Sequence, residues 1–239
     1  MAVLATVVVV IMAALMVAVE AGDHNSVFQP CSDAKIQRWD GFTVGVAIAP
    51  RESFIFNGTQ LSPCDSRLRL SSNNGAYLAV FRPKVDEISL LTINTSSLSS
   101  ETATGFMVAF AGRKYAARSL PVFVGNSSFT VTSFTLVQEF SKGTLQNLYW
   151  KTDGCSSCSG TSSFVCLNKQ YCAVKTTSCK GHNGQVDCSI GIQLAFSGTD
   201  KHDSVLNSWY EISNLRQYSL FGLYSNLKNS LTSQFNNII

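Results

Sequence analysis

The most concentrated positive charge in the sequence is a basic and aromatic run at residues 113–118, Arg-Lys-Tyr-Ala-Ala-Arg. Guanidinium and ammonium groups bind carboxylate and sulfate oxygens through charge-assisted hydrogen bonds. Arg113, Lys114 and Arg118 are therefore candidate residues for binding a polyanion. The cationic face also includes Arg67, Arg69, Arg82 and Lys84. The expected partner is an acidic polysaccharide or another protein, and the alternative is an ordinary solvated face.

The three tryptophans are candidates for stacking on sugar rings. Trp39, Trp150 and Trp209 can do so only where their rings are exposed, and in a β protein such rings more often belong to the core.

Two groups of residues are candidates for catalysis. A carbohydrate hydrolase needs two converging carboxylates, and the candidates in or beside strand patterns are Glu52, Asp86, Glu87, Glu139 and Glu211. Residues 199–204, Thr-Asp-Lys-His-Asp-Ser, contain the residue types of an acyl-transfer triad, but adjacent positions favour a solvated turn. No phosphate loop, zinc-protease motif or dinucleotide fingerprint occurs, so we expect no cofactor.

The cysteines indicate disulfides. Cys31 and Cys64 stand apart, and six others crowd together: Cys155, Cys158, Cys166, Cys172, Cys179 and Cys188. The spacing matches no complete zinc site, so we expect no metal. We favour a Cys31–Cys64 bridge, whereas the other six cysteines allow 15 connectivities. A clamped loop, Leu167 to Tyr171, leaves a proteinase inhibitor as an alternative.

The first residues predict export. Residues 2–19 are apolar apart from Thr6, and Val19-Glu20-Ala21 resembles a cleavage site, so residues 1–21 are interpreted as a signal peptide. A retained anchor is the alternative, because the segment before the apolar run carries no Lys or Arg. Three downstream acceptor sites for N-glycosylation agree with export: Asn57, Asn94 and Asn126. After cleavage we expect no membrane association, and the net charge of +3 argues against nucleic acid.

The remaining chain reads as mainly β, an antiparallel sandwich or jelly roll with a disulfide-rich segment and a C-terminal helix at 217–232. Strand patterns cover 41–49, 67–70, 77–81, 88–93, 106–110, 129–140, 145–150 and 190–196. Asn73-Asn74-Gly75 predicts a hairpin between 67–70 and 77–81. A change of phase within 129–140 predicts a bulge or a bend between two sheets. We divide the mature chain into a sandwich region (22–151), a cysteine-rich segment (152–189) and a completing segment (190–239).

Five long stretches can be compared with known families. They are Phe42 to Asp65, Ala79 to Ser97, Met107 to Ser119, Leu145 to Gly160 and Ile190 to Ile212. Together they resemble an uncharacterised family of secreted plant proteins without an established activity. The resemblance implies an apoplast or cell-wall location, and it carries over no site residue. We therefore expect a secreted, N-glycosylated, non-enzymatic wall protein that acts by binding or as a structural component, with a carbohydrate hydrolase and a proteinase inhibitor as alternatives.

Overall fold

The computed structural model describes residues 22–68, 70, 76–94, 105–113, 117–151, 154–155, 158, 164–180 and 184–208. The predicted signal peptide, the predicted C-terminal helix, Arg69, Lys114, Trp209 and Glu211 lie outside these residues. Within them, no helix is both long and apolar enough to cross a membrane.

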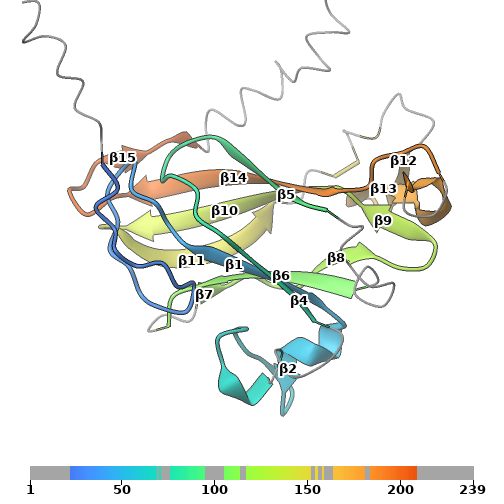
Figure 1. Ribbon diagram of the computed structural model, residues 1–239, viewed down its shortest axis with the longest axis horizontal. Coiled ribbons are helices and arrows are strands. Elements are labelled where there is room, and N and C mark those ends of the chain that lie inside the picture. The colour runs from blue at the N-terminus through green and yellow to red at the C-terminus, as the bar shows by residue number, and fades with distance from the viewer. Residues whose placement is uncertain are drawn as a thin grey trace, which may run out of the picture.

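The larger sheet has eight strands among the described residues (Figure 1). In spatial order they are β12 (Phe164–Leu167), β13 (Tyr171–Lys175), β9 (Phe129–Val131), β8 (Val122–Gly125), β6 (Gly105–Ala111), β1 (Val44–Ala49) and β4 (Tyr77–Phe81), with β7 (Ala117–Arg118) paired to β6. All pairings in this sheet are antiparallel.

The smaller sheet has five strands in the described part of the chain. Their order is β11 (Thr144–Lys151), β10 (Ser133–Ser141), β14 (Ile190–Thr199) and β15 (Val205–Leu206), with β5 (Ser89–Ile93) also paired to β14. The long central pair, β10 and β14, is parallel, from Ser133 opposite Gly191 to Phe140 opposite Gly198. The predicted β-sandwich class is confirmed, but this pair departs from a purely antiparallel arrangement.

The two sheets enclose one apolar core. It contains Val46 and Met107 from the larger sheet and Leu136, Leu194 and Phe196 from the smaller one. The chain passes from one sheet to the other at Thr132, between β9 and β10. The predicted bend between two sheets within 129–140 is therefore confirmed.

An excursion of the chain covers the outer face of the larger sheet. We call residues 50–70 the outer lobe; it contains two 3₁₀ helices, η1 (Arg51–Phe54) and η2 (Ser66–Leu68), and the hairpin β2 (Ile55–Phe56) and β3 (Thr59–Gln60). In Figure 1 it projects below the sandwich. Phe54, Leu68 and Leu70 pack on the sheet residues Ala47 and Val108. Because the lobe covers this face, every residue of β1 is buried.

The outer lobe corrects the predicted hairpin. Residues 66–68 form η2 instead of a strand, and β4 pairs with β1. The predicted turn at 73–75 lies outside the described residues. The alternation of Leu68 and Leu70 does bury both leucines, but within the irregular lobe. A two-residue period therefore indicated burial correctly and conformation wrongly.

All eight cysteines are bonded in four disulfides. Cys31 is joined to Cys64, the pair favoured from the sequence, and this bond ties the N-terminal segment to the outer lobe. The other bonds are Cys155–Cys166, Cys158–Cys172 and Cys179–Cys188. Cys166 and Cys172 are opposite each other across β12 and β13, yet each is bonded to a different preceding cysteine. The β12–β13 hairpin extends the larger sheet through pairing of β13 with β9.

Candidate anion-binding pocket

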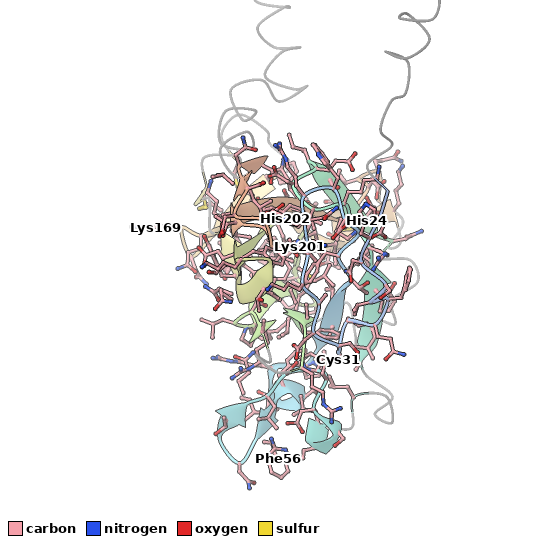
Figure 2. All side chains as sticks on the ribbon, turned by 90° about the vertical axis from the view of Figure 1, so that its left-hand side faces the viewer. His24, Cys31, Phe56, Lys169, Lys201 and His202 are labelled. Carbon is pink, nitrogen blue, oxygen red and sulfur yellow. A yellow bond between two sulfur atoms is a disulfide. The ribbon has the colours of Figure 1, made fainter. Side chains whose placement is uncertain are left out.

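A pocket of about 540 Å³ lies between the outer lobe and the end of strand β6. From the lobe it is lined by Thr59, Gln60, Leu61, Ser62, Cys64, Asp65, Ser66 and Arg67, and from the sandwich by Gly112, Arg113 and Arg118. Figure 2 shows Phe56 at the tip of the lobe and Cys31 nearer the sandwich. The Cys31–Cys64 disulfide reaches the pocket wall, because Cys64 is one of the lining residues.

The backbone directly after β6 positions Arg113. Gly112 has a φ of +73°, and its N–H donates to the carbonyl of Pro30 at 2.8 Å. The N–H of Arg113 donates to Oδ1 of Asp33 at 2.8 Å. A Cβ on Gly112 would lie 2.8 Å from that carboxylate oxygen, so glycine is required both by the left-handed conformation and by the close approach. The N-terminal segment thus fixes the main chain from which the Arg113 side chain extends.

Strand β7 positions Arg118. Arg118 is opposite Phe110 of β6, which belongs to the apolar cluster under the outer lobe. The lobe is attached at this point, since Nε2 of Gln60 donates to the carbonyl of Ser119 at 2.8 Å. Arg118 therefore faces the lobe rather than the core between the sheets.

The described residues that line the pocket include one carboxylate, that of Asp65, and it is already bonded to Arg67. Nε of Arg67 donates to Oδ1 of Asp65 at 2.9 Å, and Nη2 donates to Oδ2 at 2.7 Å. These side-chain bonds, together with a bond from the Arg67 N–H, lower the pKa of Asp65 to about 2. The same pairing raises the pKa of Arg67. This bidentate pair contributes little net charge to the pocket.

The side chains of the other two arginines, Arg113 and Arg118, form no ion pair among the described residues. Nε of Arg118 is buried without a hydrogen-bond acceptor. A buried charged donor without an acceptor is costly, so this atom is suited to an anionic group supplied by a ligand. The pocket is consequently cationic, and its hydroxyl and amide groups can hydrogen-bond a polar ligand.

The structure brings together part of the predicted polyanion site. Arg113 and Arg118 line one pocket, whereas Lys114 lies outside the described residues. Arg67 joins them. Arg82 lies elsewhere, where it bonds Asp23 and the carbonyls of Asn25 and Val27. Sequence reasoning missed the polar lobe residues such as Gln60, because nothing in their spacing links them to positions 50 residues later.

One family comparison bears on the whole chain. A family model described as uncharacterised protein DDB_G0273449 matches residues 1–130 and 114–237. The chain belongs to this family. Neither the curated proteins nor the solved structures give a match. The description of family DDB_G0273449 states no activity, so only the residues of the pocket can indicate a function.

The triad-like segment at 199–204 is a turn, as the sequence favoured. Oδ1 of Asp200 accepts the N–H groups of His202 and Ser204, and Oδ2 accepts that of Arg38. His202 approaches Gln37 through Nε2, at 3.3 Å. The Asp200 carboxylate thus binds the backbone and does not orient a histidine.

The hydrolase candidates do not meet in the pocket. Asp86 is buried beside Arg38, and Glu139 bonds Asn147 and Tyr149 on the outer side of β10. Glu52 and Glu87 are exposed away from the pocket. Among the described His, Cys, Asp and Glu residues, no group of three is arranged to hold a metal ion.

The predicted inhibitor loop is a tight turn. Asn168 and Lys169 have φ angles of +51° and +58°, and the N–H of Gln170 donates to the carbonyl of Leu167. Two consecutive positive φ angles are typical of a hairpin turn. Such a turn does not present an extended peptide, which is the form that pairs with a protein strand edge.

Proposed function

We propose that the protein is a secreted binding protein whose cationic pocket holds an acidic polysaccharide of the extracellular matrix. In a plant, the setting implied by the sequence resemblance, this matrix is the cell wall, and uronic acids supply its carboxylates. The family assignment leaves the activity open, so the pocket carries the proposal.

The single observation behind the proposal is the pair Arg113 and Arg118. Both residues line one pocket, neither side chain forms an ion pair among the described residues, and Nε of Arg118 is buried without an acceptor. A carboxylate of a bound uronic acid would satisfy that donor through a charge-assisted bond. Thr59 and Ser62, which also line the pocket, offer hydroxyl partners for the sugar.

Export is supported by the covalent structure. Four disulfides are consistent with a secreted protein, since disulfides persist in oxidising compartments. Asn57, Asn94 and Asn126 are all exposed, as an acceptor for a glycan requires. Asn57 is at the tip of the β2–β3 turn, with a φ of +48°.

A two-carboxylate hydrolase receives no support from this pocket. Among the described residues that line the pocket, Asp65 is the only one with a carboxylate, and that group is bonded to Arg67. Hydrolysis of a glycosidic bond requires a second carboxyl group across the sugar. We therefore propose binding rather than cleavage.

The test is calorimetric titration of the mature, oxidised protein with trigalacturonate. We expect binding that weakens as salt is raised, because the attraction is partly electrostatic. Arg113→Gln and Arg118→Gln should each reduce the affinity about tenfold, the effect of losing one charge-assisted bond.

The matched control is Lys175→Gln, which removes the same charge from an exposed position on β13 outside the pocket. It should leave the affinity within about twofold, as expected for a distant surface charge. Equal losses of affinity in all three variants would show a diffuse charge effect and contradict binding in the pocket. Binding of the methyl ester as tightly as the free acid would exclude carboxylate recognition.

A further inference from the structure

A loop at one end of the sandwich presents an exposed tryptophan. It runs from Ile36 to Gly41, shortly before β1. It lies at the end that carries β15, where Figure 2 shows His24, Lys201 and His202. The N–H of Lys201 donates to the carbonyl of Ile36 at 2.9 Å, so two distant parts of the chain meet at this loop.

Hydrogen bonds to two neighbouring segments, at Val85 and at Asp200, fix the backbone of the loop. The N–H of Trp39 donates to the carbonyl of Val85 at 3.1 Å. The N–H of Val85 in turn donates to the carbonyl of Asp40 at 2.7 Å. The N–H of Arg38 donates to Oδ2 of Asp200 at 3.0 Å. The side chains of Arg38 and Trp39 therefore project from a fixed backbone.

The conformation of Trp39 is unfavourable for its residue type. Its φ is +73°, a left-handed value that glycine and asparagine adopt readily and a bulky aromatic residue rarely does. The side chain remains 39% exposed, and it belongs to none of the buried apolar clusters among the described residues. Neither local conformation nor core packing accounts for tryptophan here. Backbone strain of this kind often occurs at functional sites.

Arg38 lies against one face of the ring. Its guanidinium carbon is 4.9 Å from the centroid of Trp39, and its Nε is 2.8 Å from Oδ2 of buried Asp86. Oδ1 of Asp86 accepts the N–H groups of Asn207 and Ser208 at 2.8 Å. In the described part of the chain, no other aromatic ring or cation stacks on Trp39. The indole is thus supported on one side and exposed to solvent.

We infer that Trp39 is a stacking platform for a neutral sugar ring. The C–H groups on one face of a pyranose carry partial positive charge and complement the negative face of indole. Gln37 and His202, whose side chains meet at 3.3 Å, and Arg38 offer hydrogen-bonding groups for hydroxyls at this loop.

The buried carboxylates and the paired arginine at the loop favour a neutral ligand over a polyanion. Asp40 within the loop is buried, as are Asp86 and Asp200, and the Arg38 cation is already paired with Asp86. The other tryptophans do not compete for the role: Trp150 packs on Phe134 with ring centroids 5.8 Å apart, and Trp209 lies outside the described residues. None of the cationic-pocket residues belongs to this loop, so the inference does not rest on the proposed function.

The experiment titrates the mature protein with cellohexaose and with xylohexaose, two neutral probes. Affinity is measured by calorimetry, and the indole N–H resonances are followed by NMR. We expect binding with a shifted Trp39 resonance. Trp39→Gly and Trp39→Asn should each lose at least about tenfold in affinity, since the stacked ring supplies most of the contact. Both replacement residues accept a φ near +73°, which keeps the loop conformation accessible.

The matched control is Phe28→Ala, which removes another exposed ring, 67% exposed and stacked under Arg82. It should bind the neutral probes as the wild type does. The double variant Arg113→Gln/Arg118→Gln should do the same, which separates this site from the cationic pocket. The inference is overturned if the wild type binds neither probe at millimolar concentration, or if a folded Trp39 variant retains full affinity.

Discussion

The Nε atom of Arg38 lies 2.8 Å from Oδ2 of Asp86, a carboxylate without any exposed surface. Asp86 also accepts two backbone N–H groups and has a φ of +65°. Asp86→Ala should lower the free energy of unfolding by about 3–5 kcal/mol, because it leaves these donors unpaired. Asp86→Asn should cost less, about 1–2 kcal/mol, since asparagine keeps one acceptor oxygen and tolerates the left-handed conformation. Urea denaturation measures both values, and equal losses would contradict the assigned contacts.

Gln138 offers a stabilising substitution. It lies between Leu136 and Phe140 on the core side of β10, completely buried, and neither of its amide atoms has a partner among the described residues. Gln138→Met keeps the side-chain length and removes the unpaired groups, so the free energy of unfolding should rise by about 1–2 kcal/mol. The control is Gln146→Met at an exposed position of β11, expected within about 0.5 kcal/mol of wild type. A loss of stability in Gln138→Met would show that the amide is satisfied.

The Cys31–Cys64 disulfide should support both stability and binding. Replacing both cysteines with serine should cost about 3–4 kcal/mol, as estimated for a loop of this length. Because Cys64 lines the cationic pocket, the affinity for trigalacturonate should fall as well. Breaking Cys179–Cys188, which lies outside the pocket, should reduce stability and leave that affinity unchanged. Thermal denaturation and calorimetry on the same samples distinguish the two effects.

Acid should destabilise the protein through carboxylates that are hydrogen-bonded in the folded state. Burial alone would raise the pKa of Asp200, but N–H groups of Arg38, His202 and Ser204 lower it below the ordinary 3.8. The Arg67 bonds lower the pKa of Asp65 to about 2. A lowered folded-state pKa adds stability above the unfolded-state value, and that stability is lost as pH falls through the folded-state pKa. The urea midpoint should therefore decline below about pH 4, and less steeply in Asp200→Asn.

Glycosylation can be tested position by position. After expression through a secretory pathway, treatment with an N-glycosidase should increase the electrophoretic mobility of the wild type. Asn57→Gln and Asn126→Gln should each remove part of that shift, because both side chains are exposed in turns. N-terminal sequencing of the same material should start at Gly22. An intact Met1 together with an unshifted band would contradict export.

Much of the strand content could be predicted from local patterns. The predicted strands at 88–93, 106–110, 145–150 and 190–196 correspond to β5, β6, β11 and β14. The phase change near Thr132 was visible because Val131 and Phe134 face the same core from two sheets. Burial on one face leaves a two-residue period, and that signal needs no knowledge of the partner strand.

The pairing could not be predicted, because it depends on distant segments. Nothing near Leu136 indicates that Leu194 will lie beside it in a parallel pair. The strands β8 and β12 are too short for a two-residue period to be recognised in the sequence. The arginines of the pocket were identified by charge alone, but their meeting with Arg67 depends on a lobe whose conformation the leucine pattern misrepresented.

The cysteine pattern in the β12–β13 hairpin has a consequence for producing the protein. Cys166 and Cys172 are six residues apart and directly opposed, so a newly formed hairpin brings them together first. The mature bonds join them instead to Cys155 and Cys158. Reaching that state from an early Cys166–Cys172 bond requires exchange with a free thiolate. We therefore expect recombinant yields to depend on a disulfide isomerase or a glutathione buffer, and rapid oxidation in air to trap scrambled isomers.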